Sequence, residues 1–373
     1  MIKWKQYALE DVCTRISSGK GIPSSSIHPE GPYAVYGGNG VRGYTDTANF
    51  SGDCAIVGRQ GAYCGNVRYF IGEAYMTEHA IVVCANKNHN TRYLTYLLST
   101  MNLGRLSAQS AQPGLSVKTL SKQIVKMPPL EIQNKIATLL GSIDNKVEEN
   151  QRINDNLQQQ ARALFKAWFV DFEPFGGEMP SEWHIGKLKD ILRLKRDGIK
   201  VGDEPNLPYL PIDVIPMKTF AVSEFKPNED AQSSLITFDK DDIVIGAMRV
   251  YFHRVIIAPC RGITRTTCFT LKPYDAEYLS FGLLCCDQDS SIDYAQTTSK
   301  GSTMPYAVWD GGLGDMEIAI PPKDVAKKFN DTVLPMLHHI QDSYFENRNL
   351  VEMRDSLLPR LMSGEIDVSD VEI

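Results

Sequence analysis

Two short loops of this sequence carry side chains that could recognise a polar partner. One is Arg59-Gln60-Gly61-Ala62-Tyr63, which follows the apolar run Asp53–Gly58; the other is Ala247–Tyr251, which follows Asp242–Gly246. The apolar runs predict buried strands, so each loop should begin where a strand leaves the core. Arginine, glutamine and tyrosine offer hydrogen-bonding groups that suit phosphate oxygens and the edges of nucleobases. The chemistry that these loops suggest is recognition.

No catalytic or cofactor-binding motif accompanies these loops. Ser18-Gly19-Lys20 lacks the upstream glycine of a phosphate-binding loop, because position 14 is Thr14. Tyr36-Gly37-Gly38-Asn39-Gly40 has no helix after it, so it indicates a turn. We find no Asn-Pro-Pro-Tyr-like methyltransferase motif and no glycine-rich fingerprint for S-adenosylmethionine, and the eight cysteines form no C-x-x-C pair. We expect free thiols, no catalytic residue, no metal site and no cofactor in this chain.

Composition narrows the class of protein further. The 373 residues suffice for about two to four structural units. The formal net charge of −6 argues against non-specific coating of nucleic acid, although it allows a local basic face. No apolar run is long enough to span a bilayer, and the N-terminal MIKWKQYALEDV lacks the apolar core of a signal peptide. We therefore expect a cytoplasmic protein without a membrane partner.

The element that must position the loops is a long helix within Met127–Phe175. Apolar residues recur there at alternating steps of four and three, which predicts the seam of a coiled coil. Asn150 and Asn154 continue this spacing, and polar residues at seam positions cost stability but fix the register of pairing. The predicted seam contains Ile136, Leu140, Ile143, Val147, Asn154, Leu157, Ala161, Leu164 and Trp168.

An internal repeat supplies the partner helix. Pro128-Pro129 recurs as Pro321-Pro322, and the same shift of 193 residues carries the whole seam onto a second stretch without a gap. Only Ala161 lands on a charged residue, Arg354. We expect a kink or a late helix start at Pro335. The second seam contains Phe329, Val333, Met336, Ile340, Asn347, Leu350 and Leu357.

The segments that precede the two helices also repeat, but more loosely. Trp4 recurs as Trp183, and Val244-Ile245-Gly246 stands opposite Ile56-Val57-Gly58. Many short strands with glycine punctuation and few helices predict an α+β fold for each unit. The loops between these landmarks do not match. The sequence therefore predicts a repeated scaffold with divergent loops, as in two related modules that bind different targets.

This order of globular unit, long helix, globular unit and long helix resembles the specificity (S) subunit of type I restriction–modification systems. The resemblance covers essentially the whole chain and rests on Tyr36–Gly40, Ile56–Gly61, Trp168–Phe175 and Leu358–Ile366. It implies two target-recognition domains whose helical spacers pair antiparallel, without a catalytic site. It also implies as partners a bipartite double-stranded DNA site, two modification (methyltransferase) subunits and ATP-driven restriction subunits. S-adenosylmethionine, ATP and Mg are then expected on those partner subunits.

The resemblance implies domain boundaries, although the second unit lacks some of the family motifs. We expect a first target-recognition domain at 1–127, its spacer helix at 128–175, a second recognition domain at 176–320, its spacer helix at 321–362 and a tail at 363–373. The second unit departs from the family pattern, because it has no counterpart of Tyr36–Gly40 and carries Ala247-Met248-Arg249 in place of Arg59-Gln60-Gly61. Family motifs therefore say less about how that unit would contact DNA.

Glycine-flanked loops that carry Arg, Lys, Asn, Gln or Tyr are the candidates for DNA contact. Arg and Lys can pair with guanine edges and Asn or Gln with adenine, while phosphates accept many of the other contacts. A loop arginine can equally be solvated or salt-bridged, and Tyr63 and Tyr251 can equally be core aromatics. The predicted DNA-binding residues are Lys20, Arg42, Tyr44, Arg59, Gln60, Tyr63, Asn66, Arg68, Lys200, Arg249, Tyr251, His253, Arg254, Arg261, Arg265, Lys300 and Ser302.

The end of the first helix is unusually aromatic. Trp168, Phe169 and Phe172 can form a docking surface for a partner subunit, or they can pack the helix end against its own globular unit. The seam itself is roughly 50 Å long at about 1.5 Å per residue, so helix length would set the unread spacer between two DNA half-sites. The alternative to a DNA reader is a coiled-coil assembly scaffold without sequence-specific reading. A self-contained methyltransferase or nuclease would need the cofactor fingerprint that the sequence lacks.

Overall fold

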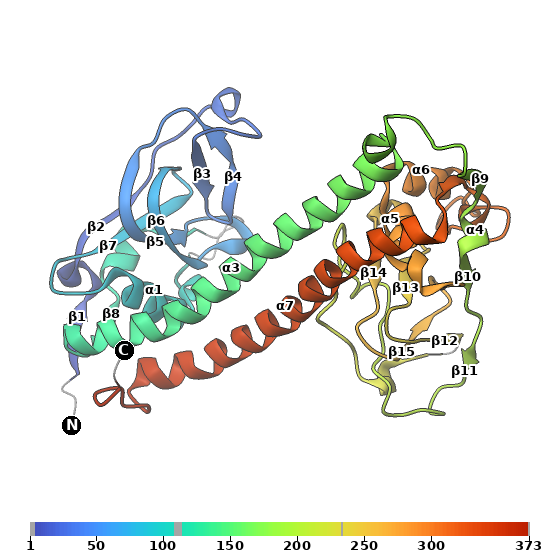
Figure 1. The fold of residues 1–373 in the computed structure, drawn as a ribbon. Helices are drawn as coiled ribbons and strands as arrows, with labels where there is room; N and C mark the ends of the chain where they lie inside the picture. The colour runs from blue at the N-terminus through green and yellow to red at the C-terminus, as the bar shows by residue number, and fades with distance from the viewer. Residues whose placement is uncertain (1–3, 108–113, 233, 372–373) are drawn as a thin grey trace. The chain divides into compact units, whose positions relative to one another are not determined.

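The computed structural model describes residues 4–107, 114–232 and 234–371. It divides into two compact units: unit 1 is Met1–Lys146 with Leu350–Ile373, and unit 2 is Val147–Asn349. Two long helices, α3 (Leu130–Phe169) and α7 (Lys323–Ser363), each contribute one end to unit 1 and the other end to unit 2 (Figure 1). None of the helices in the described residues combines the length and apolarity that a bilayer span requires.

Unit 1 is built on a six-stranded sheet with the order β2-β7-β5-β6-β3-β4. Its strands pair antiparallel except β3 and β6, which are parallel. Strand β5 alternates between two cores, because Ala55 and Val57 face the core beneath α1 whereas Cys54 and Ile56 face the other side. A second pair, β1 with β8, joins the start of the chain to the segment before α3. The bounds are β1 Lys5–Ala8, β2 Cys13–Ser18, β3 Tyr33–Gly37, β4 Gly40–Thr45, β5 Phe50–Gly58, β6 Val67–Met76, β7 Ala80–Ala85, α1 Thr91–Ser99, α2 Val117–Ser121 and β8 Ile124–Met127.

Unit 2 divides its strands among smaller sheets. One sheet has the order β10-β16-β13-β14, a second has β11-β12-β15, and β17 pairs with β9. The main core gathers strand residues with α5 and with the end of α3, where Ala161, Phe165 and Phe169 are buried. The bounds are β9 His184–Lys187, α4 Leu188–Ile191, β10 Leu192–Leu194, β11 Gly198–Ile199, β12 Leu235–Phe238, β13 Ile243–Gly246, β14 Val255–Ile257, β15 Gly262–Arg265, β16 Cys268–Pro273, α5 Leu279–Asp287, α6 Asp289–Thr297 and β17 Glu317–Ile320.

Several elements of the two units correspond by constant shifts in residue number. A shift of 179 carries β1 onto β9, a shift of 188 carries α1 onto α5, and a shift of 193 carries β8 onto β17. Strand pairing follows the same shifts, since Ile56 opposite Val82 becomes Val244 opposite Thr270. The steps in the shift mean that unit 2 has nine extra residues before β13 and five more after α5. The predicted fold class, α+β with an internal repeat and two long helices, is confirmed.

The two long helices pair antiparallel within each unit. In unit 1 an Asp144 carboxylate oxygen lies 2.9 Å from a guanidinium nitrogen of Arg354. In unit 2 the Asn150 side-chain amide donates to the Asn347 side-chain oxygen at 2.9 Å, and the rings of Phe169 and Phe329 lie 4.8 Å apart. The contacts therefore move down α7 as they move up α3. Helix α7 begins at Lys323 and continues through Pro335, so the late start considered for that proline does not occur.

Burial along the helices corrects part of the predicted seam. The positions Ile136, Leu140, Ile143, Asn154, Phe329, Val333 and Ile340 are buried, whereas Val147, Leu157, Leu164, Met336, Asn347, Leu350 and Leu357 are only partly buried. From Asn150 onward the buried positions of α3 are 150, 154, 158, 161, 165 and 169, which repeat every eleven residues rather than every seven. Gln158 and Phe165 thus replace Leu157 and Leu164. The reason is that this end of α3 must face the core of unit 2 as well as α7.

The aromatic end of α3 packs into its own unit. The Phe169 ring lies 4.7 Å from Phe281 and 5.7 Å from Trp183, and only 6% of Phe169 is exposed. Trp168 and Phe172 are partly buried, and the Phe172 ring contacts Trp183 at 5.6 Å. The structure therefore corrects the docking prediction for Phe169, which is a core residue. For Trp168 and Phe172 it shows intramolecular packing, and docking of a partner stays a prediction.

Candidate nucleic-acid interface

Recognition loop 1 (residues 58–66) connects β5 to β6 through a 3-10 turn. The Gly58 amide donates to the Asn66 carbonyl at 2.8 Å, which closes the loop on itself. The Leu115 amide donates to the Arg59 carbonyl at 2.8 Å, which fastens the loop to a neighbouring segment. A Cβ at Gly58 would lie 2.3 Å from the Tyr63 carbonyl oxygen, so this close approach requires glycine. Loop 1 is therefore a tightly packed platform at the end of a buried strand.

Recognition loop 2 (residues 246–254) connects β13 to β14 and has the same construction. The Gly246 amide donates to the Arg254 carbonyl at 2.9 Å, and the Ala307 amide donates to the Ala247 carbonyl at 2.8 Å. Each of these four positions follows from loop 1 by the repeat, with a shift of 188 residues inside the loop. The two loops differ in sequence, as expected, but they share one backbone path.

The two loops share even their unusual backbone angles. Gly61 and Gly65 have φ of +77° and +87°, in the left-handed region that glycine tolerates best. At the equivalent positions, Arg249 and His253 each adopt φ of +52°. Glycine signals in loop 1 and their absence in loop 2 therefore hid the equivalence from sequence comparison. Non-glycine residues in this region need support from surrounding contacts.

A tyrosine projects from the same position of each loop. Tyr63 is 48% exposed and Tyr251 is 46% exposed, so neither is a core aromatic. The ring centroids of Tyr251 and Phe252 lie 5.0 Å apart, and the Arg254 guanidinium lies 4.8 Å from the Phe252 ring centroid. Apart from the first glycine, tyrosine is the one residue that the two loops have in common. It marks the surface that both loops present to solvent.

The two glycine-containing motifs of unit 1 lie against each other. A Cβ at Gly38 would be 3.6 Å from the Arg59 amide nitrogen, which places the β3–β4 turn beside recognition loop 1. A Cβ at Gly40 would be 3.5 Å from the Arg68 guanidinium carbon. Gln60 completes the group, since its side-chain oxygen lies 3.1 Å from His79. Residues that are far apart in the sequence thus form one surface rich in hydrogen-bonding groups.

A polar hollow of about 670 Å³ adjoins this surface in unit 1. Asn66 and Arg68, both predicted for DNA contact, line it together with the segment around Gly104. Cys64 also lines the hollow, and burial raises the pKa of its thiol above the usual range. The side of loop 1 that carries Asn66 therefore faces a cavity with polar walls.

A second segment of unit 2 extends the surface around recognition loop 2. The Arg249 amide donates to the Pro305 carbonyl at 2.9 Å, and Lys300 pairs with Tyr306 through two 2.9 Å backbone hydrogen bonds. Met304 and Tyr306 in this segment are 55% and 47% exposed. Sequence reasoning missed both residues, because the connection after α5 is longer than its counterpart in unit 1 and shows no shared motif.

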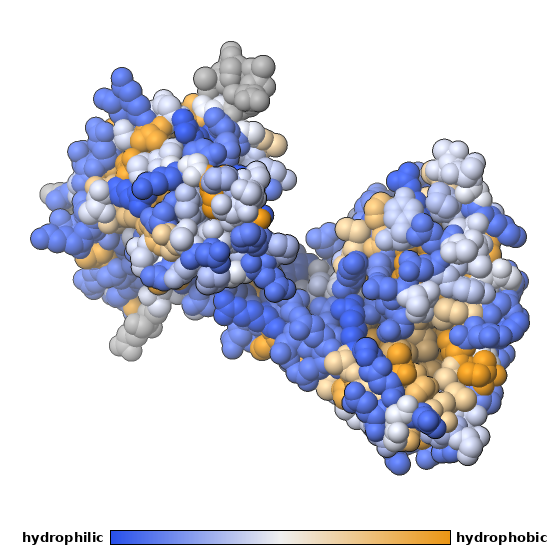
Figure 2. Space-filling model, turned by 90° about the horizontal axis from the view of Figure 1, so that it is seen from above, coloured by the Kyte–Doolittle hydropathy of each residue, from blue (hydrophilic) through white to orange (hydrophobic). Residues whose placement is uncertain are grey.

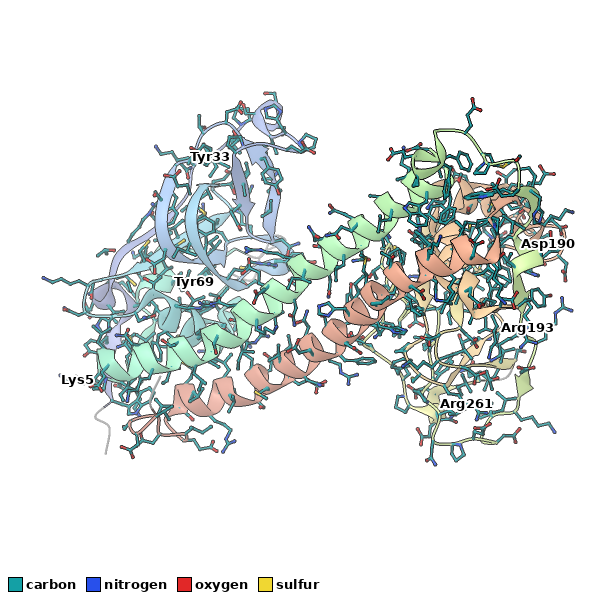
Figure 3. All side chains as sticks on the ribbon, viewed as in Figure 1. Lys5, Tyr33, Tyr69, Asp190, Arg193 and Arg261 are labelled. Carbon is teal, nitrogen blue, oxygen red and sulfur yellow. The ribbon has the colours of Figure 1, made fainter. Side chains whose placement is uncertain are left out.

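The remaining predicted contacts divide by location and burial. Tyr44 pairs with Ala34 near the open end of the β3–β4 hairpin, away from the glycine turn, and Tyr33 marks this end in Figure 3. Arg261 is labelled beside the small β11-β12-β15 sheet, where it lies 2.8 Å from Glu204. The exposed members of the predicted set are Lys20, Arg42, Tyr44, Gln60, Tyr63, Asn66, Arg68, Lys200, Arg249, Tyr251, Arg261, Lys300 and Ser302, and the partly buried members are Arg59, Arg254 and Arg265.

His253 is the predicted contact that the structure contradicts. Its side chain is 8% exposed, and its Nε2 atom lies 2.9 Å from a carboxylate oxygen of Asp287. The ring is therefore occupied inside unit 2 and does not reach the surface that carries Tyr251. The sequence offered no signal for this, because the partner carboxylate lies 34 residues away on α5.

No metal chemistry is apparent in this surface. Among the described residues, no group of three or more His, Cys, Asp or Glu side chains is arranged to hold a metal ion. All eight cysteines are free thiols, and burial raises the pKa of Cys268 to about 11.

Hydrophilic residues cover most of the face of both units shown in Figure 2, with apolar residues gathered on part of unit 2.

Two equivalent loops therefore lie at the ends of equivalent strands and carry different polar side chains. Residues 1–159 match the family model described as the type I restriction modification DNA specificity domain. The EcoprrI specificity subunit from Escherichia coli is 35% identical over 141 residues, which cover 37% of this chain and 35% of that protein. The MjaIX specificity subunit from Methanocaldococcus jannaschii is 27% identical over 319 residues, which cover 75% of this chain and 70% of that protein.

The fold is also found in a solved structure. The S subunit of a type I restriction–modification system from M. genitalium superposes with a TM-score of 0.70 at 17% sequence identity, and the match covers 96% of both chains. The chain is similar to type I restriction enzyme specificity subunits, and its first 159 residues match the model of their DNA specificity domain. The match with the E. coli relative spans only about a third of that protein, whereas the match with the archaeal relative spans most of it.

Proposed function

We propose that this chain is a non-catalytic DNA-reading subunit of a type I restriction–modification complex, in which each unit reads one half of a bipartite site. The observation that carries the proposal is the repeat itself. Equivalent strands and helices recur in the two units, and the recognition loops keep one backbone path while their side chains differ. Two domains that bind different DNA half-sites would need such a common backbone with different exposed side chains.

The exposed groups suit DNA chemistry. Loop 1 and its neighbours present Gln60, Asn66 and Arg68, which can pair with adenine or guanine edges. Loop 2 presents Arg249, with Lys300 on the adjoining segment. The net charge of −6 leaves these loops as local sites rather than parts of a uniformly basic surface. Specific reading of short half-sites fits this arrangement better than non-specific coating.

The shared tyrosines suit a different task. Because Tyr63 and Tyr251 recur at one loop position, a contact that they make should be one that both half-sites offer. Sugar and phosphate groups are common to every half-site, whereas base edges are not. The tyrosines would anchor the loops on the DNA backbone, and the neighbouring side chains would distinguish bases.

The similarity to type I specificity subunits supports a set of partners. The chain would bring two modification subunits, and then restriction subunits, to the DNA in the cytoplasm, with S-adenosylmethionine, ATP and Mg bound by those subunits. Helices α3 and α7 would set the unread spacer, since the 40 residues of α3 extend roughly 60 Å. Partly buried Trp168 and Phe172 stay candidates for contact with a modification subunit.

Selection from a random duplex pool tests this function. The chain is purified with its cognate modification subunits, and bound DNA is sequenced at near-physiological salt, because non-specific contacts weaken steeply with salt. A split motif of two unrelated half-sites around a fixed gap is the expected result. A continuous motif would mean that one unit alone reads DNA. No enrichment by an intact complex would favour the coiled-coil assembly scaffold instead.

A further inference from the structure

A buried carboxylate in unit 2 joins the long helix α3 to recognition loop 2. The side chain of Asp287, at the end of α5, is 1% exposed. One of its oxygens lies 2.7 Å from Nε of Arg162 on α3, and the other lies 2.9 Å from Nε2 of His253 in the loop. Since an ionised carboxylate is costly to bury without partners, the three side chains form one interdependent group.

A neighbouring segment closes the same group from the backbone side. The Lys218 amide donates to the His253 carbonyl at 2.8 Å, while the Arg162 guanidinium donates to the Lys218 carbonyl at 3.2 Å. That guanidinium also lies 4.6 Å from the centroid of the buried Phe220 ring. Both the ring and the main chain of His253 are therefore tied to the residues that hold Arg162.

The same segment is fastened along α7. The Gln341 side chain accepts from the Val222 amide at 3.0 Å and donates to the Val222 carbonyl at 2.6 Å. Arg348 donates to the Ser223 carbonyl at 2.6 Å. The residues from 218 to 223 thus connect loop 2 with both long helices inside unit 2. They fall in the part of unit 2 that has extra residues relative to unit 1.

Unit 1 builds its loop without these groups. The repeat places Gly65 at the position of His253, Ser99 at that of Asp287 and Asp355 at that of Arg162. Gly65 adopts the left-handed angle by itself, whereas His253 adopts it as a non-glycine residue. Loop 2 therefore relies on side-chain contacts where loop 1 relies on glycine.

We propose that Asp287 is a positioning residue, which couples Arg162 on the spacer helix to His253 and so fixes the direction in which loop 2 presents Arg249 and Tyr251 to DNA. The inference rests on the proposed DNA-reading function and adds a specificity determinant that does not touch the DNA. Because the group occurs in unit 2 only, its loss should change one half-site and leave the other unchanged.

Three variants and one control separate positioning from folding. His253→Gly reproduces the residue of loop 1, so it removes backbone strain together with the contact to Asp287. His253→Asn tolerates the same backbone angle and keeps a side-chain donor. Asp287→Asn keeps the shape and removes the charge. Asp289→Asn is the control, since Asp289 is 89% exposed and lies 3.4 Å from the other ring nitrogen of His253.

The test repeats the duplex selection with each variant in the complete complex. We expect H253G and D287N to lose base preference in one half-site, with about tenfold weaker binding to the wild-type site, while the other half-site and the gap stay unchanged. H253N should retain most of the preference, and D289N all of it. Thermal unfolding of each complex should show that H253G remains folded.

The outcomes distinguish this inference from the function on which it rests. If the wild type selects a split motif and both H253G and D287N select the same motif, positioning by Asp287 is overturned and DNA reading by the two units stands. Equal loss of both half-sites would also overturn it, because the effect would not be confined to unit 2. If the wild type selects no split motif, the proposed function itself falls.

Discussion

The two units join their globular parts to the long helices with opposite chemistry at equivalent positions. In unit 1 the Tyr96 hydroxyl donates to Asp144 on α3, and Asp144 lies 2.9 Å from Arg354 on α7. Burial, and then the bond to Asp144, raises the pKa of Tyr96 well above its usual range. At the equivalent positions unit 2 has only buried apolar residues, Leu284, Leu337 and Ala161.

Around recognition loop 2 the polar contacts belong to unit 2 instead of unit 1. There unit 2 uses the charged group of Arg162, Asp287 and His253, whereas unit 1 has residues that cannot form it. The same backbone arrangement is therefore compatible with either polar or apolar side-chain contacts at equivalent positions. The repeat therefore preserves the backbone geometry, while the side chains that stabilise this geometry differ between the two units.

The largest effect should come from the aromatic core at the end of α3. Phe169→Ala leaves a cavity among Phe281, Phe329 and Trp183 and should lower the free energy of unfolding of unit 2 by about 3–5 kcal/mol. Urea denaturation followed by tryptophan fluorescence measures this loss. The repeat-equivalent change in unit 1 is Met362→Ala.

The control for this change is Val170→Ala, because Val170 is 52% exposed and should contribute less than about 0.5 kcal/mol. We expect M362A to destabilise unit 1 by about 2–4 kcal/mol, since Met362 is 7% exposed. A stable F169A variant that only fails to bind modification subunits would restore the docking role of Phe169.

The polar tie of unit 1 should be exchangeable for the apolar contact of unit 2. Asp144→Ala leaves the Arg354 guanidinium without this partner and should cost about 1–3 kcal/mol of unfolding free energy. The triple variant Y96L/D144L/R354A imports the residues of unit 2 and should lie within about 1.5 kcal/mol of the wild type. Urea unfolding followed by circular dichroism measures both. A triple variant less stable than D144A would show that the frames differ more than the repeat indicates.

The first glycine of the recognition loops should be more constrained in unit 1. Gly58→Ala brings Cβ within 2.7 Å of the Gly38 carbonyl oxygen as well as against Tyr63, which should cost about 1–3 kcal/mol. Gly246→Ala meets Arg254 and Ile212 side-chain atoms at 3.2 Å and should cost no more than about 1 kcal/mol. Hydrogen exchange of the loop amides reports the change in each unit. Equal protection in the two variants would contradict the tighter packing of loop 1.

The smallest effect concerns acid stability. A hydrogen bond from Lys195 holds the pKa of Asp239 below its usual value, and unit 1 has Ile16 at the position of Lys195. Because the pKa is lower in the folded state, the bond stabilises unit 2 above about pH 4 and this stabilisation is lost as the pH falls through the folded pKa. Asp239→Asn should flatten the acid limb of the unfolding profile. An unchanged slope below pH 4 would show that other carboxylates dominate.

Much of the frame could be predicted from sequence. The double prolines place the helix starts correctly, because Leu130 and Lys323 each follow one pair. The apolar runs before the loops form β5 and β13 as expected. These signals are local, since proline geometry and short-range periodicity do not depend on what packs against them.

The parts that could not be predicted depend on contacts between distant residues. The eleven-residue burial in the second half of α3 arises from packing against unit 2, which no heptad count contains. The pairing of Asp242 was not predictable either, because its side chain is 1% exposed and lies 2.8 Å from Lys195, which is 47 residues away in the sequence. The equivalence of the two recognition loops was not visible in the sequence, because Arg249 adopts a positive φ angle that is more typical of glycine.

Exchanging residues between the two recognition loops tests whether these loops read the DNA. The variant R59A/Q60M/G61R/A62V gives loop 1 the residues of loop 2, while the shared Tyr63 and the Gly65 turn remain. With the complete complex and a random duplex pool, we expect a changed half-site for unit 1, together with the wild-type half-site for unit 2 and the same gap. An intact complex that selects both wild-type half-sites would contradict it, because the loops would then not be what reads the DNA.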